Sequence, residues 1–153
     1  MSEALLIKPI GIVESPVKDP VDENWGAVTS KIVIKPEYGP GLLGLGDFSH
    51  VIVVTYLHKA SFDPTRHLQR RPRGLDHMPK VGIFSQRAKD RPNHLGFTAV
   101  ELLAVGESDI TVRGLDAIDG TPVIDIKPYF PQYDRVSSPV VPAWVNDLME
   151  HYF

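Results

Sequence analysis

The stretch Val51-Ile52-Val53-Val54-Thr55-Tyr56-Leu57 is the most strand-like part of the chain, and its first five residues are all β-branched. Such side chains favour strands because they pack well on a pleated surface. A nearly continuous apolar run of this length is typical of a strand that is covered on both faces. We therefore predict a central β-strand at residues 51–57.

Shorter strand-like segments lie on either side of this run. Residues 27–35 alternate, with Val28, Ser30, Ile32 and Ile34 on one face. Further strands are predicted at residues 5–7, 10–13, 81–84, 97–105, 110–115 and 123–126, and the polar turn at 106–109 joins two of them in a hairpin. Residues 142–153 fit a short amphipathic helix. Many short strands, few helices, 12 glycines and 14 prolines predict an all-β barrel or sandwich.

The composition is that of a small globular protein. With 153 residues, the chain is expected to form a single domain, residues 1–153, around one core. It has no apolar run long enough for a membrane helix and no basic stretch before its short N-terminal apolar run, so we expect a cytoplasmic protein that does not enter a membrane. The absence of cysteine excludes disulfides, thiolate metal sites and cysteine nucleophiles.

Positive charge is concentrated in the middle of the chain. Residues 58–91 hold nine of the sixteen lysines and arginines against three acidic residues, although the whole chain has a net charge of -3. One interpretation is a solvated loop surface. The other is a local binding surface for a polyanion, because attraction to phosphates depends on the nearby potential more than on the total charge.

Two further patterns are candidate ligand sites. Residues 39–44, GPGLLG, match the G-x-G-x-x-G pattern, but a strand is predicted soon afterwards where a dinucleotide fingerprint would open a helix. This favours a flexible glycine loop. The spacings of His58, His67, His77 and His94 match no compact metal-binding motif, so no metal is expected.

Residues 85–96, SQRAKDRPNHLG, form an unusually charged loop between two predicted strands. The residue before Pro92 is biased toward extended geometry. If extension reaches back to Arg87, then Arg87, Lys89 and Arg91 project to one side as a row of cations. Such a row is suited to gripping phosphate or carboxylate oxygens.

Residues 119–129, DGTPVIDIKPY, begin with the Asp-Gly pair that is common in hairpins. In an extended strand, Val123, Asp125 and Lys127 project to one face, while Ile124 and Ile126 project to the other and face the core. The acid and the base then form either an exposed strand surface or part of a site beside Tyr129. Spacing alone leaves both interpretations open.

Taken together, four segments resemble one known family. They are IGIVESP at 10–16, the strand that ends in His58, GIFSQRAKDRPNHLG at 82–96 and DGTPVIDIKPYFP at 119–131. Over about residues 7–135 the chain resembles the TrmO family, also called the YaeB or VirR family, of S-adenosylmethionine-dependent tRNA methyltransferases. The resemblance implies a small single-sheet antiparallel β-barrel with a short C-terminal helix. It also implies a homodimer, and N6-methylation of threonylcarbamoyladenosine next to the anticodon of tRNA.

The resemblance implies a set of residues that contact the S-adenosylmethionine cofactor beside the subunit interface. These are Arg87, Phe97, Asp119, Gly120, Thr121, Pro122, His58 and Lys59. Asn24, Trp25 and Gly26 lie where the family places another contact, although the family usually shows a Pro-Arg-Gln-like triplet there.

The expected reaction also needs a proton acceptor and a surface for RNA. We expect Asp125 or Tyr129 to take the proton that leaves the adenine nitrogen. Arg66, Arg70, Arg71 and Arg73 are expected to contact the RNA backbone, and Lys89 and Arg91 either contact RNA or support the loop. His94 stands where the family commonly has proline, and we expect it to mark a difference in substrate.

Two alternatives to this function remain. The longer bacterial members have a C-terminal tRNA-binding domain, which we expect this chain to lack, and its net charge is negative. The protein would then methylate another RNA or a small molecule, or it would be a non-catalytic regulatory protein that binds S-adenosylmethionine.

Overall fold

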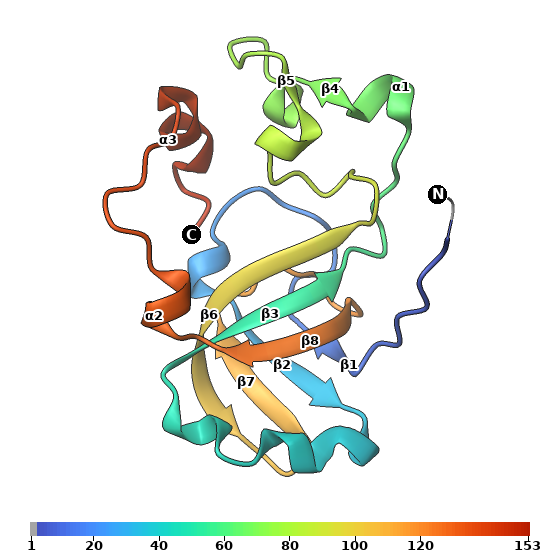
Figure 1. Cartoon of the computed structure of the whole chain (residues 1–153), viewed down its shortest axis with the longest axis vertical. Coiled ribbons are helices and arrows are strands. Elements are labelled where there is room, and N and C mark those ends of the chain that lie inside the picture. The colour runs from blue at the N-terminus through green and yellow to red at the C-terminus, as the bar shows by residue number, and fades with distance from the viewer. Residues whose placement is uncertain (1–2) are drawn as a thin grey trace.

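Six antiparallel strands close into one barrel in the order β1-β2-β7-β6-β3-β8 (Figure 1). The computed structural model describes residues 3–153. The barrel strands are β1 (Gly11–Glu14), β2 (Thr29–Ile34), β3 (His50–Tyr56), β6 (Leu95–Val105), β7 (Asp109–Arg113) and β8 (Pro122–Pro128). The predicted mainly β class, with a single-sheet barrel and a short C-terminal helix, is confirmed.

The barrel interior is filled by alternate apolar residues of each strand, as period-two geometry requires. Ile32 and Ile34 of β2 and Val51 and Val53 of β3 belong to this core. The prediction that β3 is covered on both faces holds at Ile52, which is only 4% exposed on the outer face, but is wrong toward the strand ends, where His50 and Tyr56 are exposed.

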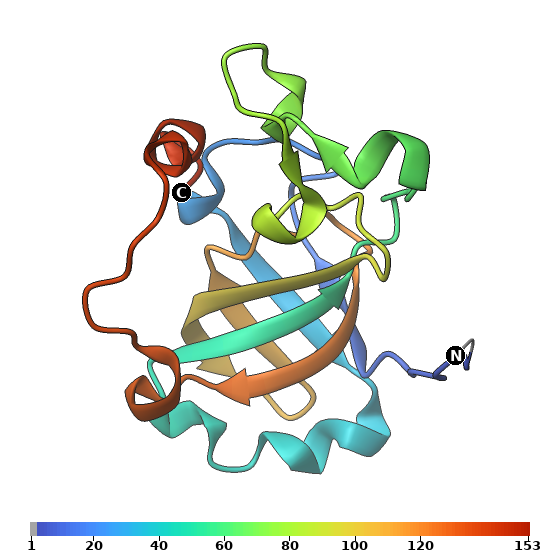
Figure 2. The ribbon, with the colours of Figure 1, turned by 45° about the horizontal axis from the view of Figure 1, so that its top comes forward.

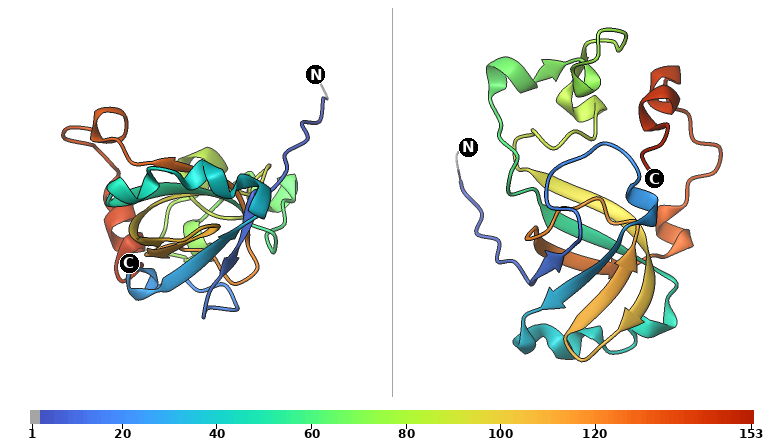
Figure 3. Two further views of the ribbon diagram at one scale, coloured as in Figure 1. Left: turned by 90° about the horizontal axis from the view of Figure 1, so that it is seen from below. Right: turned by 180° about the vertical axis from the view of Figure 1, so that it is seen from behind.

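One end of the barrel is closed by two 3₁₀ helices, η2 (Pro36–Leu42) and η3 (Leu45–Asp47), which cross it in Figure 1 and in the view from below in Figure 3. Leu42 is part of the core, and Leu45 packs against it. The glycine-rich stretch at 39–44 therefore contributes to a structural plug and opens no nucleotide-binding helix.

An insert between β3 and β6 extends beyond the other end of the barrel (Figure 2). It holds α1 (Pro64–His67), the two-stranded sheet of β4 (Gln69–Arg70) and β5 (Val81–Gly82), and the 3₁₀ helices η4 (Pro72–Gly74) and η5 (Ile83–Ser85). A third short helix, α3 (Ala143–Met149), lies beside it, after α2 (Pro131–Asp134). No helix within residues 3–153 is long and apolar enough to cross a membrane.

Several predicted boundaries are wrong. Residues 5–7 form no strand and are exposed, and the strand predicted at 81–84 ends at Gly82, because η5 begins at the next residue. Helix α3 stops at Met149, because residues 151–153 run alongside η1 (Trp25–Ala27). The face assignment of β8 is wrong at Val123, which lies in the core with Ile126, because the register shifts between Val54 and Thr55 of the neighbouring strand.

Candidate functional site

Four strand ends meet at the end of the barrel that faces the insert, which we call the insert-side rim. There β1 and β3 end, and β6 and β8 begin, because antiparallel neighbours place the end of one strand beside the start of the next. The rim consists of residues 15–18, 56–58, 94–98 and 114–122. It therefore gathers the end of the charged loop at residues 85–96, which we call the opening loop, the strand that leads to His58 and the Asp-Gly turn.

The turn at Asp119, Gly120 and Thr121 is held against β1. The Gly120 amide donates to the Val13 carbonyl at 2.8 Å, and the Val13 amide donates to the Thr121 carbonyl at 2.9 Å. Gly120 has a φ of +83°, which glycine adopts without strain. A Cβ at Gly120 would lie 3.8 Å from Nε2 of His58. The structure thus brings His58 beside this turn.

The Asp119 carboxylate anchors the chain that leaves β1. It accepts a hydrogen bond of 2.9 Å from the Ser15 amide and pairs with Nζ of Lys18 at 3.0 Å. The Ser15 amide and then Lys18 hold the pKa of Asp119 below its ordinary value. The carboxylate is therefore ionised at neutral pH and already has two partners.

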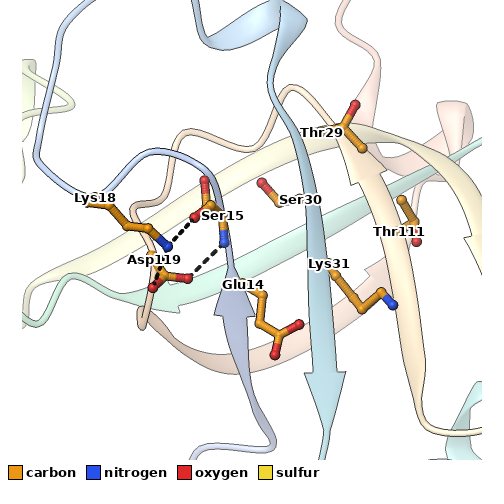
Figure 4. A pocket seen from close by; sticks show the side chains of 8 residues that line it. All are labelled: Glu14, Ser15, Lys18, Thr29, Ser30, Lys31, Thr111 and Asp119. Atoms are coloured by element: carbon orange, nitrogen blue, oxygen red, sulfur yellow. Dashed lines mark hydrogen bonds and ion pairs between the residues drawn. The ribbon is translucent and has the colours of Figure 1, made fainter.

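An open pocket of about 610 Å³ lies beside Asp119 and continues along β1 and β2 (Figure 4). Its lining includes Ser15, Thr29, Ser30 and Thr111, together with Glu14, Lys18, Lys31 and Asp119. The Ser30 residue is only 2% exposed, and its Oγ has no hydrogen-bond partner among the described residues. Ser30 alternates with the exposed Thr29 and Lys31, so its hydroxyl lies on the core face of β2 and not on the exposed face of the pocket.

The opening loop closes onto the start of β6. The Arg87 guanidinium donates to the carbonyl of Phe97, whose ring is half exposed on the outer face of the barrel. A Cβ at Gly96 would lie 2.5 Å from Oγ1 of Thr55 and 3.1 Å from Leu57, so only glycine fits here. Arg87 and Phe97, both expected to contact the cofactor, are thus in direct contact.

Asp90 ties the loop to the insert. Its carboxylate accepts a 3.0 Å hydrogen bond from the Ser61 amide and lies 3.5 Å from Lys89, 3.7 Å from Arg70 and 3.9 Å from the buried His67. Burial raises the pKa of Asp90, but the Ser61 amide, Lys89 and His67 outweigh it and hold that pKa below its ordinary value. Two of the cations expected to contact RNA therefore share one internal acidic partner.

Two of the other arginines expected to contact RNA, Arg91 and Arg71, instead bind backbone carbonyls of this protein, whereas the Arg66 side chain binds none within the described residues. Arg91 donates to the carbonyls of Gln86 and Ala88, so it supports the loop from within and forms no outward row with Lys89. The Arg71 guanidinium donates to the Met78 carbonyl. Arg66 is exposed and forms no ion pair within residues 3–153.

Asn24, Trp25 and Gly26 contact the C-terminal segment of the chain. The amides of Asn24 and Trp25 donate to the carbonyls of His151 and Tyr152, each at 2.7 Å. A Cβ at Gly26 would lie 2.6 Å from the backbone of Phe153. These three residues therefore support a docked C-terminal segment.

Two residues that the sequence analysis missed hold this segment to the rim. The Tyr152 hydroxyl donates to one oxygen of Asp116 at 2.5 Å, and the Thr98 hydroxyl donates to the other at 2.5 Å. Burial, and then the charge and hydrogen bond of Asp116, raise the pKa of Tyr152 above its ordinary value. Arg73 lies 5.7 Å from the centre of the Tyr152 ring. No local motif marks these residues, because Asp116 and Tyr152 are 36 positions apart.

The two expected proton acceptors, Asp125 and Tyr129, do not lie together in the structure. Val54 pairs with Phe97 on one side and Asp125 on the other, so Asp125 is two strand spacings from Phe97, roughly 9.5 Å, on the outer face. Its carboxylate pairs with Lys127 at 3.5 Å. Tyr129 is four residues further along and donates its amide to the His50 carbonyl, at the end of the barrel opposite the insert-side rim.

No group of three His, Asp or Glu side chains within the described residues is arranged to hold a metal ion. The site is instead a rim of glycine turns, hydroxyl groups and structural ion pairs on a closed antiparallel barrel. Fold and site together define a small β-barrel protein with an open polar pocket at one rim.

The chain belongs to the TrmO family. A family model described as the tRNA-methyltransferase O N-terminal domain matches residues 15–135. A crystal structure of TrmO from Pseudomonas aeruginosa superposes with a TM-score of 0.76 and 28% identity, over 94% of this chain and 63% of that one. This chain thus spans less than two thirds of that solved protein.

Two curated relatives differ in length. A protein of Methanothermobacter thermautotrophicus, named "Probable S-adenosyl-L-methionine-binding protein", is 45% identical over 85% of this chain and 93% of its own length. A mouse protein named tRNA (adenine(37)-N6)-methyltransferase is 36% identical over 85% of this chain but only 32% of its own length.

Proposed function

We propose that this protein binds S-adenosylmethionine at the insert-side rim and transfers its methyl group to N6 of threonylcarbamoyladenosine beside the anticodon of tRNA. The observation that carries the proposal is the meeting of the opening loop and the Asp119–Thr121 turn at one rim, with His58 3.8 Å from the Gly120 Cβ position. Membership of the TrmO family and the name of the mouse relative support the reaction. A tRNA substrate would also place the protein in the cytoplasm.

The residues at the rim suit this cofactor. A pocket of about 610 Å³ lies within the roughly 300–1,000 Å³ that is usual for small-molecule sites. Thr29 and Thr111 provide hydroxyls on the exposed side of the pocket for a ribose or an amino acid group. The backbone of Gly120 and Thr121 and the side chain of His58, which lie together beside Asp119, would hold the remaining groups.

Bound S-adenosylmethionine supplies an electrophilic methyl group. The main task of the protein is then to align the acceptor nitrogen, because good alignment contributes about 7–11 kcal/mol in favourable cases. The Phe97 ring is half exposed and offers the base a flat apolar surface, and its backbone carbonyl accepts a hydrogen bond from Arg87. Asp125 lies on the same outer face and is our candidate for taking the departing proton.

A homodimer forms part of the proposal. The outer face of β6 and β3 exposes Tyr56, Leu95 and Phe97 around the covered Ile52. Figures 1 and 2 show no other element over this face. An apolar sheet surface beside the rim is suited to a second copy of the chain, which would cover it and complete the walls of the site. The second copy would also bring another Tyr129 into the assembly.

A second candidate function is cofactor binding without turnover. It is supported by the Methanothermobacter relative, of which this chain covers 93% and whose name states only cofactor binding. The named methyltransferase from mouse is much longer. The same rim would then serve a regulatory protein that responds to S-adenosylmethionine, or an enzyme that methylates another acceptor.

Calorimetric titration with S-adenosylmethionine, followed by transfer of a labelled methyl group to tRNA with and without threonylcarbamoyl groups, separates these candidates. We expect saturable cofactor binding and label at the adenosine next to the anticodon only in modified tRNA. Cofactor binding without transfer would favour the second candidate. Absence of cofactor binding would refute both.

A further inference from the structure

The insert carries a second groove, distinct from the rim pocket. It has a volume of about 560 Å³ and lies between α1 and the β5–η5 segment. Thr65, Gln69, Lys80, Phe84 and Ser85 contribute its polar and aromatic lining. Nothing in the proposed cofactor site accounts for this groove.

Phe84 is the most unusual residue in the groove, because its ring is 80% exposed. Burial of a phenylalanine side chain stabilises a folded protein, so a fixed exposed ring gives up that gain. The segment that carries it is well anchored: Ile83 is buried, and the side-chain amide nitrogen (Nε2) of Gln86 donates to the carbonyls of Arg70 and Val81 at 3.0 Å each. The ring is therefore presented to solvent by a rigid backbone.

Among the residues that the structure describes, the two cations at the groove, Lys80 and Arg66, lack the acidic partner that Arg70 and Lys89 of the neighbouring segments share. Lys80 is the only charged residue in its lining, and it forms no ion pair within residues 3–153. Arg66, next to Thr65 on α1, is also exposed and unpaired within that part of the chain. Asp90, by contrast, already pairs with Lys89 and Arg70. The groove thus combines uncompensated positive charge with an exposed aromatic ring.

We propose that this groove binds a nucleotide of single-stranded RNA, whose base stacks on Phe84 and whose phosphate meets Lys80. Aromatic rings beside cations are the usual way in which proteins hold unpaired nucleotides, since every base has a flat face. Phe84 precedes Arg87 by three residues, so their Cα atoms are at most about 10 Å apart. The groove would therefore hold RNA within a few nucleotides of the rim. The inference rests on the proposed function for the identity of the RNA.

The test measures the affinity of the full chain for a fluorescein-labelled RNA stem-loop by anisotropy, without cofactor. We expect Phe84→Ala to weaken binding by about 5- to 100-fold and Phe84→Trp to retain it. Lys80→Gln should weaken binding and lower the slope of log affinity against log salt by about 0.7, the value for one phosphate contact on a single strand. The same RNA closed into a continuous duplex should bind weakly to the wild type and show no effect of Phe84→Ala.

Matched controls lie on other surfaces. Tyr133→Ala removes an aromatic side chain that is 84% exposed on α2, and Lys35→Gln removes an exposed lysine beyond β2; both should leave RNA affinity unchanged. Equal losses in the control variants, or a change of molecular mass in light scattering of Phe84→Ala with RNA affinity unchanged, would overturn the proposal. The latter would assign Phe84 to a protein contact.

Cofactor titration of the same variants separates this inference from the proposed function. Phe84→Ala should bind S-adenosylmethionine as the wild type does. A wild-type protein that binds the cofactor and methylates tRNA, together with a Phe84→Ala variant that binds and methylates the same RNA equally well, would refute the groove assignment alone. RNA binding that depends on Phe84 without any cofactor affinity would instead refute the proposed methyl transfer and leave the groove assignment standing.

Discussion

Replacing Tyr152 with phenylalanine tests whether the C-terminal segment is fixed to the rim by one hydrogen bond. The substitution keeps the ring and its position under Arg73 but removes the hydroxyl that donates to Asp116 at 2.5 Å. Asp116 would keep only the Thr98 hydroxyl as a donor within the described residues. The Tyr152→Phe substitution therefore removes one of the two hydrogen-bond donors to Asp116 and leaves the ring in place.

The expected loss follows from the charge of the acceptor. A hydrogen bond to a charged group contributes about 1.5–3 kcal/mol, more than a bond between neutral groups. For a chain of this size, each kcal/mol shifts the melting temperature by about 2–4 °C, so the midpoint should fall by roughly 3–12 °C. Urea denaturation and thermal melting followed by circular dichroism would measure both quantities.

The pH dependence gives an independent check. Because burial and Asp116 raise the pKa of Tyr152 in the folded protein, the contribution of the protonated hydroxyl is fully present below the unfolded value of about 10. It is lost as the pH rises above that value. The wild type should therefore lose up to about 1.4 kcal/mol per pH unit that the Tyr152→Phe variant does not lose, and the two stability curves should converge.

A matched variant is Tyr133→Phe, which removes a hydroxyl from an exposed ring on α2 and should change stability by less than about 0.5 kcal/mol. If Tyr152→Phe unfolds within 0.5 kcal/mol of the wild type and keeps the same alkaline slope, the hydrogen bond to Asp116 does not hold the C-terminal segment, and our reasoning fails.

Three further predictions concern the rim and the loop. Gly120→Ala should cost about 1–2 kcal/mol because of the positive φ, and should weaken S-adenosylmethionine binding in calorimetry, whereas Gly41→Ala, with open space around it, should be neutral in both measurements. His94 has a φ of +53°, so His94→Pro should destabilise the protein by about 1–3 kcal/mol in urea titration while His94→Gly is tolerated; equal effects would contradict this account. Asp90→Ala should cost about 1–3 kcal/mol and raise the proteolysis rate of the loop after Ser85, and an unchanged cleavage rate would show that Asp90 does not tie the loop to the insert.

The sequence predicted the barrel strands well because their signals are local. The β-branched run at 51–57 and the alternation through Ser30, Ile32 and Ile34 each specify a strand and its buried face without reference to the rest of the chain. The Asp-Gly turn and the loop before Gly96 were also recognisable, because a positive φ or a close backbone contact requires particular residues. Hydrophobic patterning could not reveal the bulge that places Val123 and Ile126 together in the core.

The sequence by itself thus determined the strands, the family resemblance and the segments that form the candidate site. Only the tertiary structure decided what the charged residues do. The basic middle of the chain suggested an RNA-binding surface, yet Arg70 and Lys89 share Asp90, and Arg91 binds loop carbonyls. The pairing of Tyr152 with Asp116 and the exposure of Phe84 were equally invisible. The physical reason is that strand propensity acts between neighbours in sequence, whereas an ion pair, a buried hydrogen bond or an exposed ring depends on which distant segments meet.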